Sequence, residues 1–419
     1  MITNRKHVES VARALVCAVA LLLGLSASAA AQSGTFSNIV MSSVPTPRSY
    51  PEGITLGPDG ALWFTESAGN KIGRLSPSGP IAEFALPTPG SDPAAITTGP
   101  DGALWFTEWI GNKIGRIAIT GSITEFPLPT PDCRPDGITA GPDGALWFAE
   151  QQARDSKIGR ITVSGAITEY PVPTPDSSPD WIAVGPDGAM WFTENAQSNI
   201  GRITTAGVIT EYPVPTASAS MDQISSGPDG ALWFTENAGN KIGRITIAGA
   251  VTEYPLPTAG AAPYAITTGA DGALWFTEQF GGKIGRITTG GIITEFPVAS
   301  ESEPLGMTAG PDKALWFALY NDNDIARAPA CALGLSASFA ANTLTTNFNL
   351  GIPESVVWSI DAGDTALLTK PIPAVVPPHA VALHFNSFPN GGNVVVKSAL
   401  TSGLGAILCS EWTTVNTAQ

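Results

Sequence analysis

Short runs in which apolar and polar residues alternate recur through the middle of the chain at a nearly constant interval. The intervals between successive copies are 42, 42, 44, 42, 42 and 41 residues. A period near 42 residues with short β-like runs is typical of a propeller. The run Asp-Gly-Ala-Leu-Trp-Phe-Thr-Glu or a close variant begins at Asp59, Asp101, Asp143, Asp187, Asp229, Asp271 and Asp312.

Each repeat predicts four strands, named A to D here in chain order. The first repeat places them at 53–57, 61–66, 71–75 and 81–86. The Asp-Gly pair between strands A and B favours a hairpin, because glycine adopts positive φ without a steric penalty. Seven such units predict an all-β fold, a seven-bladed β-propeller over residues 36–329.

The two ends of the repeat region predict how the ring closes. The last unit, which begins at Pro304, has strands A, B and C but no Ile-Thr-Glu-Phe run. Residues 38–47 align instead with strand D of another repeat, at 122–131. We therefore expect the N-terminal strand to complete the last blade, which would leave neither edge of the ring unpaired.

Residues 1–31 have the pattern of a signal peptide. Arg5, Lys6 and Arg13 precede an apolar run at 14–25 and small residues at 26–31. This order predicts cleavage before Gln32 and a secreted or periplasmic protein. The apolar run is shorter than the roughly 20 residues of a spanning helix, so we expect no membrane span.

Residues 330–419 depart from the repeat and predict a small C-terminal β-sandwich. Asn390-Gly391-Gly392 marks a turn between two strand-like runs. Cys331 and Cys409 lie near the two ends of this region, and in an exported chain they predict a disulfide. Cys133 is then left unpaired, and we interpret it as a bystander in a loop.

The composition of the chain limits the classes of partner that it can bind. The net charge is −15, which disfavours nucleic acid as a partner. Four Cys and three His exclude a large zinc framework. The A–B turns barely vary between repeats, whereas the D–A and B–C connections differ strongly and share one end of the blade. That face is where we expect a small-molecule or cationic ligand to bind, on a monomer.

The residue after the proline that precedes the strand-A run, as at Pro51, should lie nearest the mouth of the central channel. Aromatic residues expected on the same face are Trp109, Trp181, Tyr264 and Phe280. An acidic mouth with aromatic walls would suit a cation or cationic ligand, and a purely structural role is the open alternative. The mouth positions are Glu52, Ala94, Asp136, Asp180, Asp222, Tyr264 and Leu305.

Three other repeated side chains are interpreted as structural. The strand-B Trp should pack one blade on the next. The strand-B Glu, as at Glu66, is expected to pair with the strand-C Arg, as at Arg74. The strand-D Glu, as at Glu83, is expected to be a solvated charge at the outer edge.

The unit GPDGALWFTE…NKIGRI…ITEFPLPTP resembles the repeat of the virginiamycin B lyases, also called streptogramin B lyases. The resemblance covers about residues 36–329 and implies a seven-bladed propeller that opens a cyclic depsipeptide by elimination at its ester. It also implies a catalytic His and Mg²⁺ held by glutamates. The two His positions correspond to Tyr264 and Leu305, and the two Glu positions to Glu303 and Leu319.

Glu303 alone matches, and there is no His between His7 and His379. The resemblance therefore makes Glu303 and Tyr264 the catalytic candidates and Glu303 the metal candidate, with Mg²⁺ or Ca²⁺ as the cofactor. We predict a ligand- or cation-binding protein with a degenerate lyase site. One alternative is an active C–O lyase or hydrolase that uses carboxylates and a metal, such as Glu303 with Asp222 or Asp180. Another is an extracellular interaction or adhesion module.

Overall fold

The computed structural model describes the backbone and side chains of residues 36 and 39–328, except 77–78, 152–155 and 299–301. At 32–33 and in the strands between 336 and 416 it describes the backbone alone. The predicted signal peptide lies outside the described residues. Among the residues that are described, no helix is long and apolar enough to cross a membrane.

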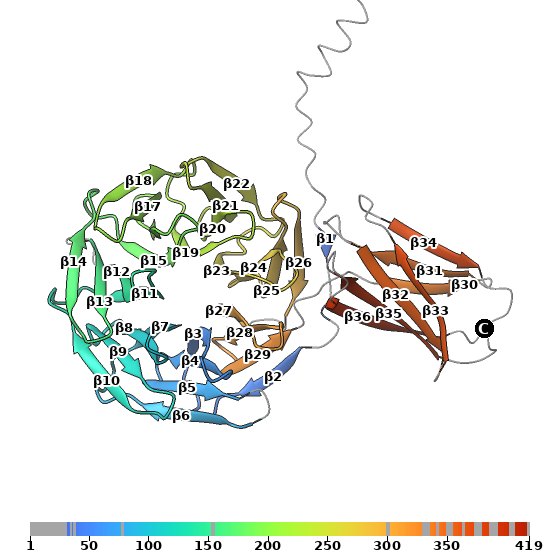
Figure 1. Ribbon diagram of the computed structural model, residues 1–419, viewed down its shortest axis with the longest axis horizontal. Coiled ribbons are helices and arrows are strands. Elements are labelled where there is room, and N and C mark those ends of the chain that lie inside the picture. The colour runs from blue at the N-terminus through green and yellow to red at the C-terminus, as the bar shows by residue number, and fades with distance from the viewer. Residues whose placement is uncertain are drawn as a thin grey trace, which may run out of the picture. The chain divides into compact units, whose positions relative to one another are not determined.

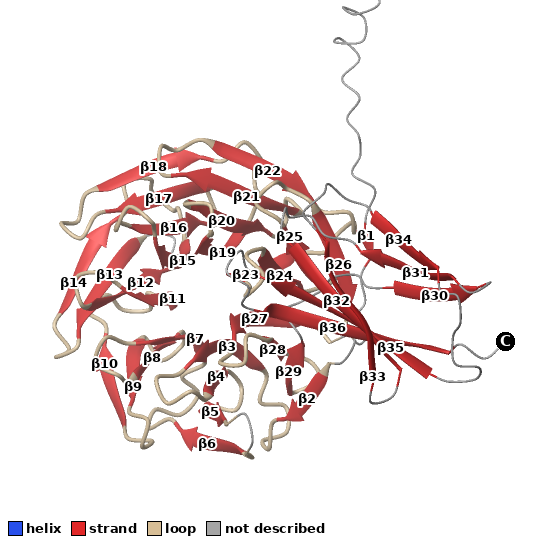
Figure 2. Ribbon diagram, turned by 45° about the vertical axis from the view of Figure 1, so that its right-hand side comes forward, coloured by secondary structure: helices blue, strands red, loops and turns tan. Residues whose placement is uncertain are grey.

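Seven antiparallel sheets are arranged around a central axis, as the repeat predicts (Figure 1). Each blade has four strands in order from the axis to the rim, and the sheet of blade 6 has β1 (Gln32–Ser33) as a fifth strand beside β26 (Ile293–Pro297). Figure 2 shows strands and loops as the only elements of the described ring. The first three blades are β3 (Pro51–Leu56), β4 (Leu62–Glu66), β5 (Lys71–Leu75) and β6 (Ile81–Ala85); β7 (Pro93–Thr98), β8 (Leu104–Glu108), β9 (Lys113–Ile117) and β10 (Ile123–Pro127); β11 (Pro135–Ala140), β12 (Ala145–Glu150), β13 (Lys157–Thr162) and β14 (Ile167–Pro171).

The next three blades repeat this order, and the seventh takes three strands from the end of the repeat region. Blades 4 to 6 are β15 (Pro179–Val184), β16 (Met190–Glu194), β17 (Asn199–Ile203) and β18 (Ile209–Pro213); β19 (Met221–Ser226), β20 (Ala231–Glu236), β21 (Lys241–Thr246) and β22 (Val251–Pro255); β23 (Pro263–Thr268), β24 (Leu274–Glu278), β25 (Lys283–Ile287) and β26 (Ile293–Pro297). Blade 7 contains β27 (Pro304–Ala309), β28 (Leu315–Leu319) and β29 (Asp324–Ala328), and a two-residue strand β1 (Gln32–Ser33) precedes the ring in sequence.

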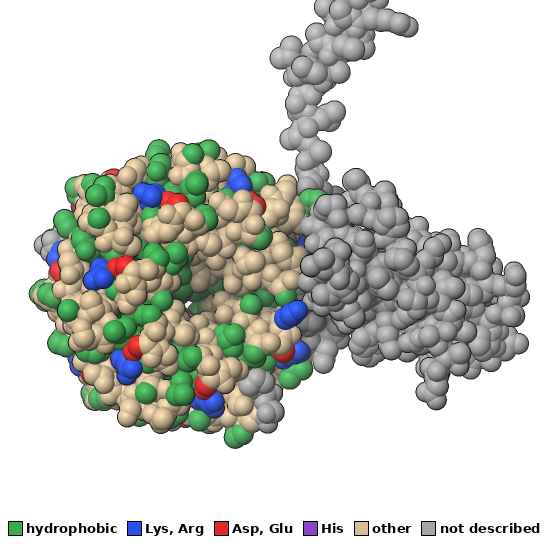
Figure 3. Space-filling view, in the orientation of Figure 1, with side chains coloured by type: hydrophobic (Ala, Val, Ile, Leu, Met, Phe, Trp, Pro, Cys, Tyr) green, Lys and Arg blue, Asp and Glu red, His purple; other side chains and the backbone are tan. Residues whose placement is uncertain are grey.

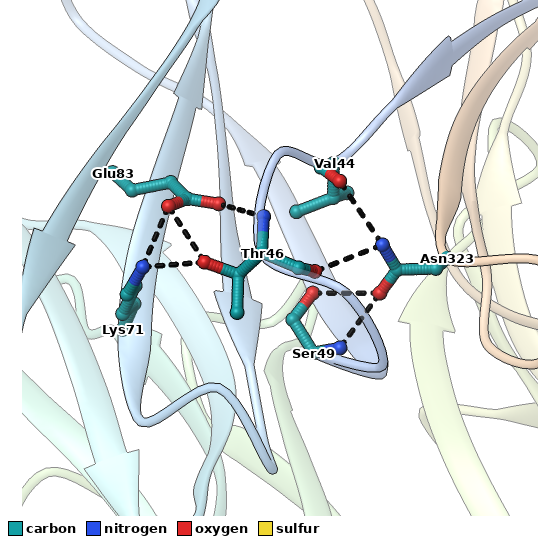
Figure 4. A network of polar contacts seen from close by, with 6 residues as sticks. All are labelled: Val44, Thr46, Ser49, Lys71, Glu83 and Asn323. Carbon is teal, nitrogen blue, oxygen red and sulfur yellow. Dashed lines mark hydrogen bonds and ion pairs between the residues drawn. The ribbon is translucent and has the colours of Figure 1, made fainter.

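The N-terminal strand closes the ring, which confirms the prediction. Strand β2 (Val40–Ser43) pairs antiparallel with β29, with Val40 opposite Arg327. Beyond it, the Asn323 amide donates to the carbonyls of Val44 and Thr46 over 3.1 and 3.0 Å. Its Oδ1 accepts from the backbone N–H and the hydroxyl of Ser49 at 2.7 and 2.9 Å (Figure 4).

The strand-B Trp packs neighbouring blades together, as predicted. Trp63 is fully buried and belongs to one apolar cluster with Ile96 and Leu104 of the next blade. Its indole N–H donates to Asp59 of the A–B turn over 3.0 Å. The Arg74 guanidinium lies 5.6 Å from the centre of the same ring.

The predicted pairing of the strand-B Glu with the strand-C Arg is wrong. Arg74 pairs instead with Asp59 at 2.7 Å, and the same Arg–Asp pair recurs in every blade, as Arg116 with Asp101 shows. Figure 3 shows basic and acidic side chains side by side around the ring. The reason is register: Arg74 is opposite Trp63, so both lie on one side of the sheet, whereas Glu66 is three residues further along and lies on the other.

The strand-D Glu is also not a free edge charge. Glu83 pairs with Lys71 at 2.6 Å and accepts from the backbone N–H and hydroxyl of Thr46 at 2.7 and 2.8 Å (Figure 4). Thr46 belongs to the loop that enters the blade, so the carboxylate ties two blades together. Five of the other blades have an equivalent Glu–Thr contact, as between Glu125 and Thr88.

The C-terminal region contains two further antiparallel sheets, described by their backbone. One orders β30 (Ser336–Ala340), β31 (Thr343–Phe348) and β34 (His379–His384), and the other orders β33 (Thr365–Ile372), β32 (Ser355–Ala362), β35 (Asn393–Thr401) and β36 (Ile407–Asn416). Cys331 and the side chain of Cys409 lie outside the described part, so the sandwich and its disulfide stay predictions. Cys133 is a free, fully buried cysteine.

Candidate functional site

Two variable loops form one face of the ring and are fixed to each other in every blade. The residue before strand A has a positive φ of 41° to 55°, although it is never glycine. Its carbonyl accepts from the N–H of the residue after strand B over 2.9 to 3.2 Å. The donor and acceptor pairs are Ser67 and Tyr50, Trp109 and Asp92, Gln151 and Arg134, Asn195 and Ser178, Asn237 and Ser220, Gln279 and Ala262, and Tyr320 and Glu303.

A β-bulge at the start of each strand A presents the predicted mouth residues. In blade 1, Pro51 pairs with Glu66 and Ile54 with Phe64, so strand A has one residue more than strand B. The same shift occurs in all seven blades. Bulges redirect side chains and are frequent next to functional sites. Glu52 and its counterparts lie inside this bulge.

The structure brings four of the predicted carboxyl groups together from blades 1, 3, 4 and 5. Burial raises the pKa of Asp136 well above its usual value, and the charges of Asp180, Glu52 and Asp222 raise it further. Burial likewise raises the pKa of Glu52 to about 7, aided by Asp92 and then Asp180. These carboxyls therefore oppose one another's ionisation, as like charges at close range do.

Asp136 and Asp180 form a carboxyl–carboxyl hydrogen bond, which requires one shared proton. Burial raises the pKa of Asp180 to about 6, and hydrogen bonds from Asn195 and Asp136 limit this rise. Asn195 donates to Asp180 over 3.0 Å, and Gln151 donates to its other oxygen over 3.4 Å. The pair is thus held by amides on neighbouring loops.

Asp222 and Glu52 have one neutral donor each. Asn237 donates to Asp222 over 2.8 Å, and the phenol of Tyr264 donates to Glu52 over 3.2 Å. Burial raises the pKa of Asp222, and Asp180 adds to that shift. Burial, followed by Glu52 and the other mouth carboxyls, raises the pKa of Tyr264, which is therefore a hydrogen-bond donor at neutral pH.

The four predicted aromatic residues lie in three different places on the ring. Trp181 and Tyr264 line a cavity of about 10 Å³ together with Glu52, Ala94 and Gln223, which is room for about one water-sized group. Trp109 lies on the loops, with Arg134 4.6 Å from its ring centre, and its N–H donates to Gln151. Phe280 is 67% exposed and lines a separate hollow of about 510 Å³ with Glu303 and Asn321.

Several residues of the mouth were not among those predicted from the sequence. Gln151, Asn195 and Asn237 hold its carboxylates, and Tyr50 stacks on Tyr320 with ring centres 4.7 Å apart. Apart from Tyr50, these residues share one position, directly after strand B. That position varies from repeat to repeat, and this variation was the signal that would have identified them.

The positions that would hold the implied Mg²⁺ do not fit a metal. Leu319, at one of the two Glu positions, is fully buried in an apolar cluster with Leu315 and Ala326, and Leu305, at one of the two His positions, is also buried. Neither side chain has a ligand atom. Among the described residues, no group of three His, Cys, Asp or Glu is arranged to hold a metal ion. Glu303 is the remaining candidate, and it faces the hollow beside Phe280.

Comparison with known proteins agrees with the repeat and the fold. The model of the Virginiamycin B lyase family matches residues 30–155 and 151–336. The chain belongs to the virginiamycin B lyase family. A solved streptogramin B lyase is 44% identical over 70% of this chain and 97% of its own, with a TM-score of 0.67. The lyase from Staphylococcus aureus gives 44% identity, the same 70% coverage, 99% of its own chain and a TM-score of 0.67.

A third structure of the family is of a histidine variant. It is a catalytically inactive His-to-Ala variant of the Staphylococcus aureus lyase with quinupristin, 43% identical over 70% of this chain and 99% of its own, with a TM-score of 0.67. Among curated lyases, that of Bordetella parapertussis is 51% identical over 43 residues, 10% of this chain. That of Bacillus licheniformis is 55% identical over 38 residues, 9% of this chain. These local matches span 14% and 13% of the curated relatives' own lengths.

Proposed function

We propose that this member of the virginiamycin B lyase family is an exported binding protein whose channel mouth takes the ammonium group of a small primary amine. The observation that carries the proposal is the proximity of Glu52, Asp136, Asp180 and Asp222, whose charges together raise the pKa of Asp136, with neutral amides and a phenol as donors to Asp180, Asp222 and Glu52. Glu52 lines the cavity beside Trp181 and Tyr264. A cation that enters this group gains several Coulomb interactions at short range and in a partly desolvated site.

The size and lining of the cavity favour an ammonium group over a larger cation. Its volume of about 10 Å³ admits a water-sized group, and an ammonium has that size and three N–H donors. Trp181 and Tyr264 line the cavity with Glu52, and their aromatic rings would add cation–π attraction. The rest of the ligand would lie above the cavity on the variable loops.

Loss of lyase activity is the second part of the proposal. Tyr264 and Leu305 occupy the positions where the family resemblance places histidine. The raised pKa of Tyr264 makes it a poor general base at neutral pH, and Leu305 has no proton to transfer. Leu319 has no ligand atom for the metal. One retained glutamate, Glu303, does not replace this set.

Calorimetry with butylammonium tests the binding site. Tetramethylammonium is the matched control, because it has the same charge but no N–H donor and a larger head. We expect butylammonium to bind the purified chain and to lose about tenfold or more in affinity with Asp180→Asn or Glu52→Gln. Equal binding of the two cations, or binding that is indifferent to both substitutions, would contradict the site.

An active lyase is the competing function, because Glu303 is retained beside a hollow of about 510 Å³. Incubation with a streptogramin B antibiotic and Mg²⁺, followed by mass spectrometry, separates the two. We expect the ring to stay closed. Ring opening that disappears with Glu303→Ala would establish the lyase and overturn this part of the proposal. The triple variant Tyr264→His, Leu305→His and Leu319→Glu shows whether the scaffold can still support the reaction.

A further inference from the structure

Six buried glutamates form a second ring of carboxyls, beneath the loops that bear the mouth. Each ends strand B of its blade and has no exposed surface. Among the described residues, neither oxygen has a hydrogen-bond partner in five of them, and the sixth, Glu194, has a single contact with Asn199 at 3.4 Å. The six are Glu66, Glu108, Glu150, Glu194, Glu236 and Glu278.

The space around these carboxyls is closed in blades 1 and 2. A Cβ atom added to Gly69 of the B–C turn would lie 2.9 Å from Oε2 of Glu66 and 2.8 Å from Cβ of Ser49. Gly111 covers Glu108 and Ser91 in the same way, with both distances at 2.7 Å. The glycine in the turn therefore acts as a lid that fits the carboxyl and the serine closely, and a larger residue would have to displace one of them.

The neighbouring serine indicates which proton state fits this space. Two carbonyls accept from the Asn323 amide, so its Oδ1 faces Ser49 and accepts the hydroxyl proton at 2.9 Å. Ser49 can then only accept a hydrogen bond from Glu66, so Glu66 must be a protonated acid to make one. Blade 2 repeats the arrangement, with the hydroxyl of Ser91 donating to Asn70 at 2.9 Å.

The charged residues near these glutamates do not offset the cost of ionising a buried carboxyl. Burial raises the pKa of Glu66 to about 7, and the nearby Glu83 raises it further, while Lys71 and then Ser49 lower it by less. Lys71 is already paired with Glu83 at 2.6 Å. The other five sites have the same strand-D glutamate as a neighbour, and burial raises their pKa values to about 7 or 8.

The seventh blade shows that a neutral side chain satisfies this position. Leu319 replaces the glutamate there and is fully buried, while Ser302 still occupies the serine position and is also buried. Cys133, Ala219 and Ala261 replace the serine in blades 3, 5 and 6. The strand-B glutamate position thus accepts an uncharged side chain in blade 7, which fits a glutamate carboxyl that is neutral in the folded protein.

We propose that the buried carboxyls of blades 1, 2, 4, 5 and 6, whose B–C turns the structure describes, form a pH-sensitive latch: in the neutral form they hold each of these turns against its D–A loop, and a rise in pH loosens the turns. The turn of blade 1 is held by the N–H groups of Ala68 and Gly69, which donate to the carbonyl of Ser49 at 3.1 Å. When the turn is closed, an ionised carboxylate has no hydrogen-bond partner. When the turn opens, water hydrates the carboxylate, so ionisation favours the open turn. The latch does not depend on which ligand the mouth binds.

The direction of the pH effect follows from the pKa of the carboxyl in the open and closed states of the turn. In the open turn the carboxyl ionises near its usual pKa of 4.5, and in the closed turn near 7. The closed turn therefore binds more protons between these values, and its stability falls as pH rises from about 4.5 to 7. Above the higher value no further loss is expected.

Hydrogen exchange of the turn amides tests the latch on the full chain. The rates at pH 5, 6, 7 and 8 are corrected for the intrinsic pH dependence of exchange. For Ala68 and Gly69 we expect protection to fall by up to about tenfold per pH unit between pH 5 and 7. In Glu66→Gln, whose amide has nearly the same shape as the carboxyl but does not ionise, blade 1 should lose this dependence while the turn of blade 2 retains it.

Two results would overturn the proposal. One is the same pH dependence in blade 1 of the wild type and of Glu66→Gln. The other is an infrared spectrum at pH 6 in which the C=O band of protonated carboxyls does not decrease in Glu66→Gln. If Glu66→Gln does not fold, Glu66→Leu takes its place, because blade 7 has leucine at this position.

Discussion

The phenol of Tyr264 donates a hydrogen bond to Glu52 over 3.2 Å, although the two residues belong to blades 6 and 1. Leu305 occupies the corresponding position of the blade between them and offers no polar group. The bond therefore crosses the mouth past blade 7, the blade that the N-terminal strand completes. It joins two parts of the ring that are 212 residues apart in sequence.

Removal of the hydroxyl from Tyr264 should raise the pKa of Glu52. The hydrogen bond favours the ionised carboxylate, whereas burial and Asp92 oppose it. In Tyr264→Phe we therefore expect the pKa of Glu52 to move above its value of about 7, with a stability loss of about 1 kcal/mol. Carboxyl ¹³C shifts measured as a function of pH report this value. A pKa that stays constant or falls would show that the bond is not made in solution.

Affinity for butylammonium should increase with pH between about 5 and 7. Glu52 and Asp180 have raised pKa values of about 7 and 6, so both are largely protonated at pH 5 and ionise over this interval. Butylammonium keeps its charge throughout, because amines ionise near pH 10. Calorimetry at several pH values should also detect uptake of the cation with release of protons. An affinity that is independent of pH would exclude these two carboxyls as the ligand's partners.

Asn323→Gly should destabilise the ring more than the matched substitution Asn240→Gly. Both residues have positive φ, so glycine removes the side chain without adding strain. Asn323 loses four hydrogen bonds at the closure, whereas Asn240 loses two, to Ala261 and Thr258. At about 1 kcal/mol for each bond, we expect losses of about 4 and 2 kcal/mol in denaturant titrations. Equal losses would mean that the Asn323 contacts at the ring closure stabilise the protein no more than the Asn240 contacts between two consecutive blades.

The repeat made the fold predictable, because seven copies of one pattern reveal strand lengths, turns and the missing last strand. The same copies could have corrected the pairing of Arg74. It lies opposite Trp63 in the hairpin, and Glu66, three residues from Trp63, must point to the other side of the sheet. Register, rather than charge complementarity, decides which groups meet. Counting positions from the A–B turn would have shown this.

Other features were not accessible from the sequence. The positive φ of Tyr50 and Arg134 contradicts their residue preferences, and the surrounding loop contacts impose it. The shared proton of Asp136 and Asp180 depends on the distance between two blades and on burial, which no single repeat reveals. The mouth could be named as acidic, but the amides that hold it required the structure.

Cys133→Ser should be tolerated, because Cys133 occupies the place that Ser49 and Ser91 have in blades 1 and 2. Its N–H donates to Asn112 over 2.8 Å, as those serines do to Asn323 and Asn70. The new hydroxyl can also donate to Asn112, so we expect a change in unfolding free energy within about 1 kcal/mol.

The same position predicts a thiol that does not react in the native protein. Cys133 is fully buried, and burial followed by Glu150 raises its pKa, so little thiolate forms at neutral pH. A thiol reagent should modify it only after denaturation, and Cys133→Leu, which is too large for the site, should lower the thermal midpoint where Cys133→Ser does not. A large loss with serine, or rapid labelling of the folded chain, would show that the serine-like arrangement of blade 3 is not the one present in solution.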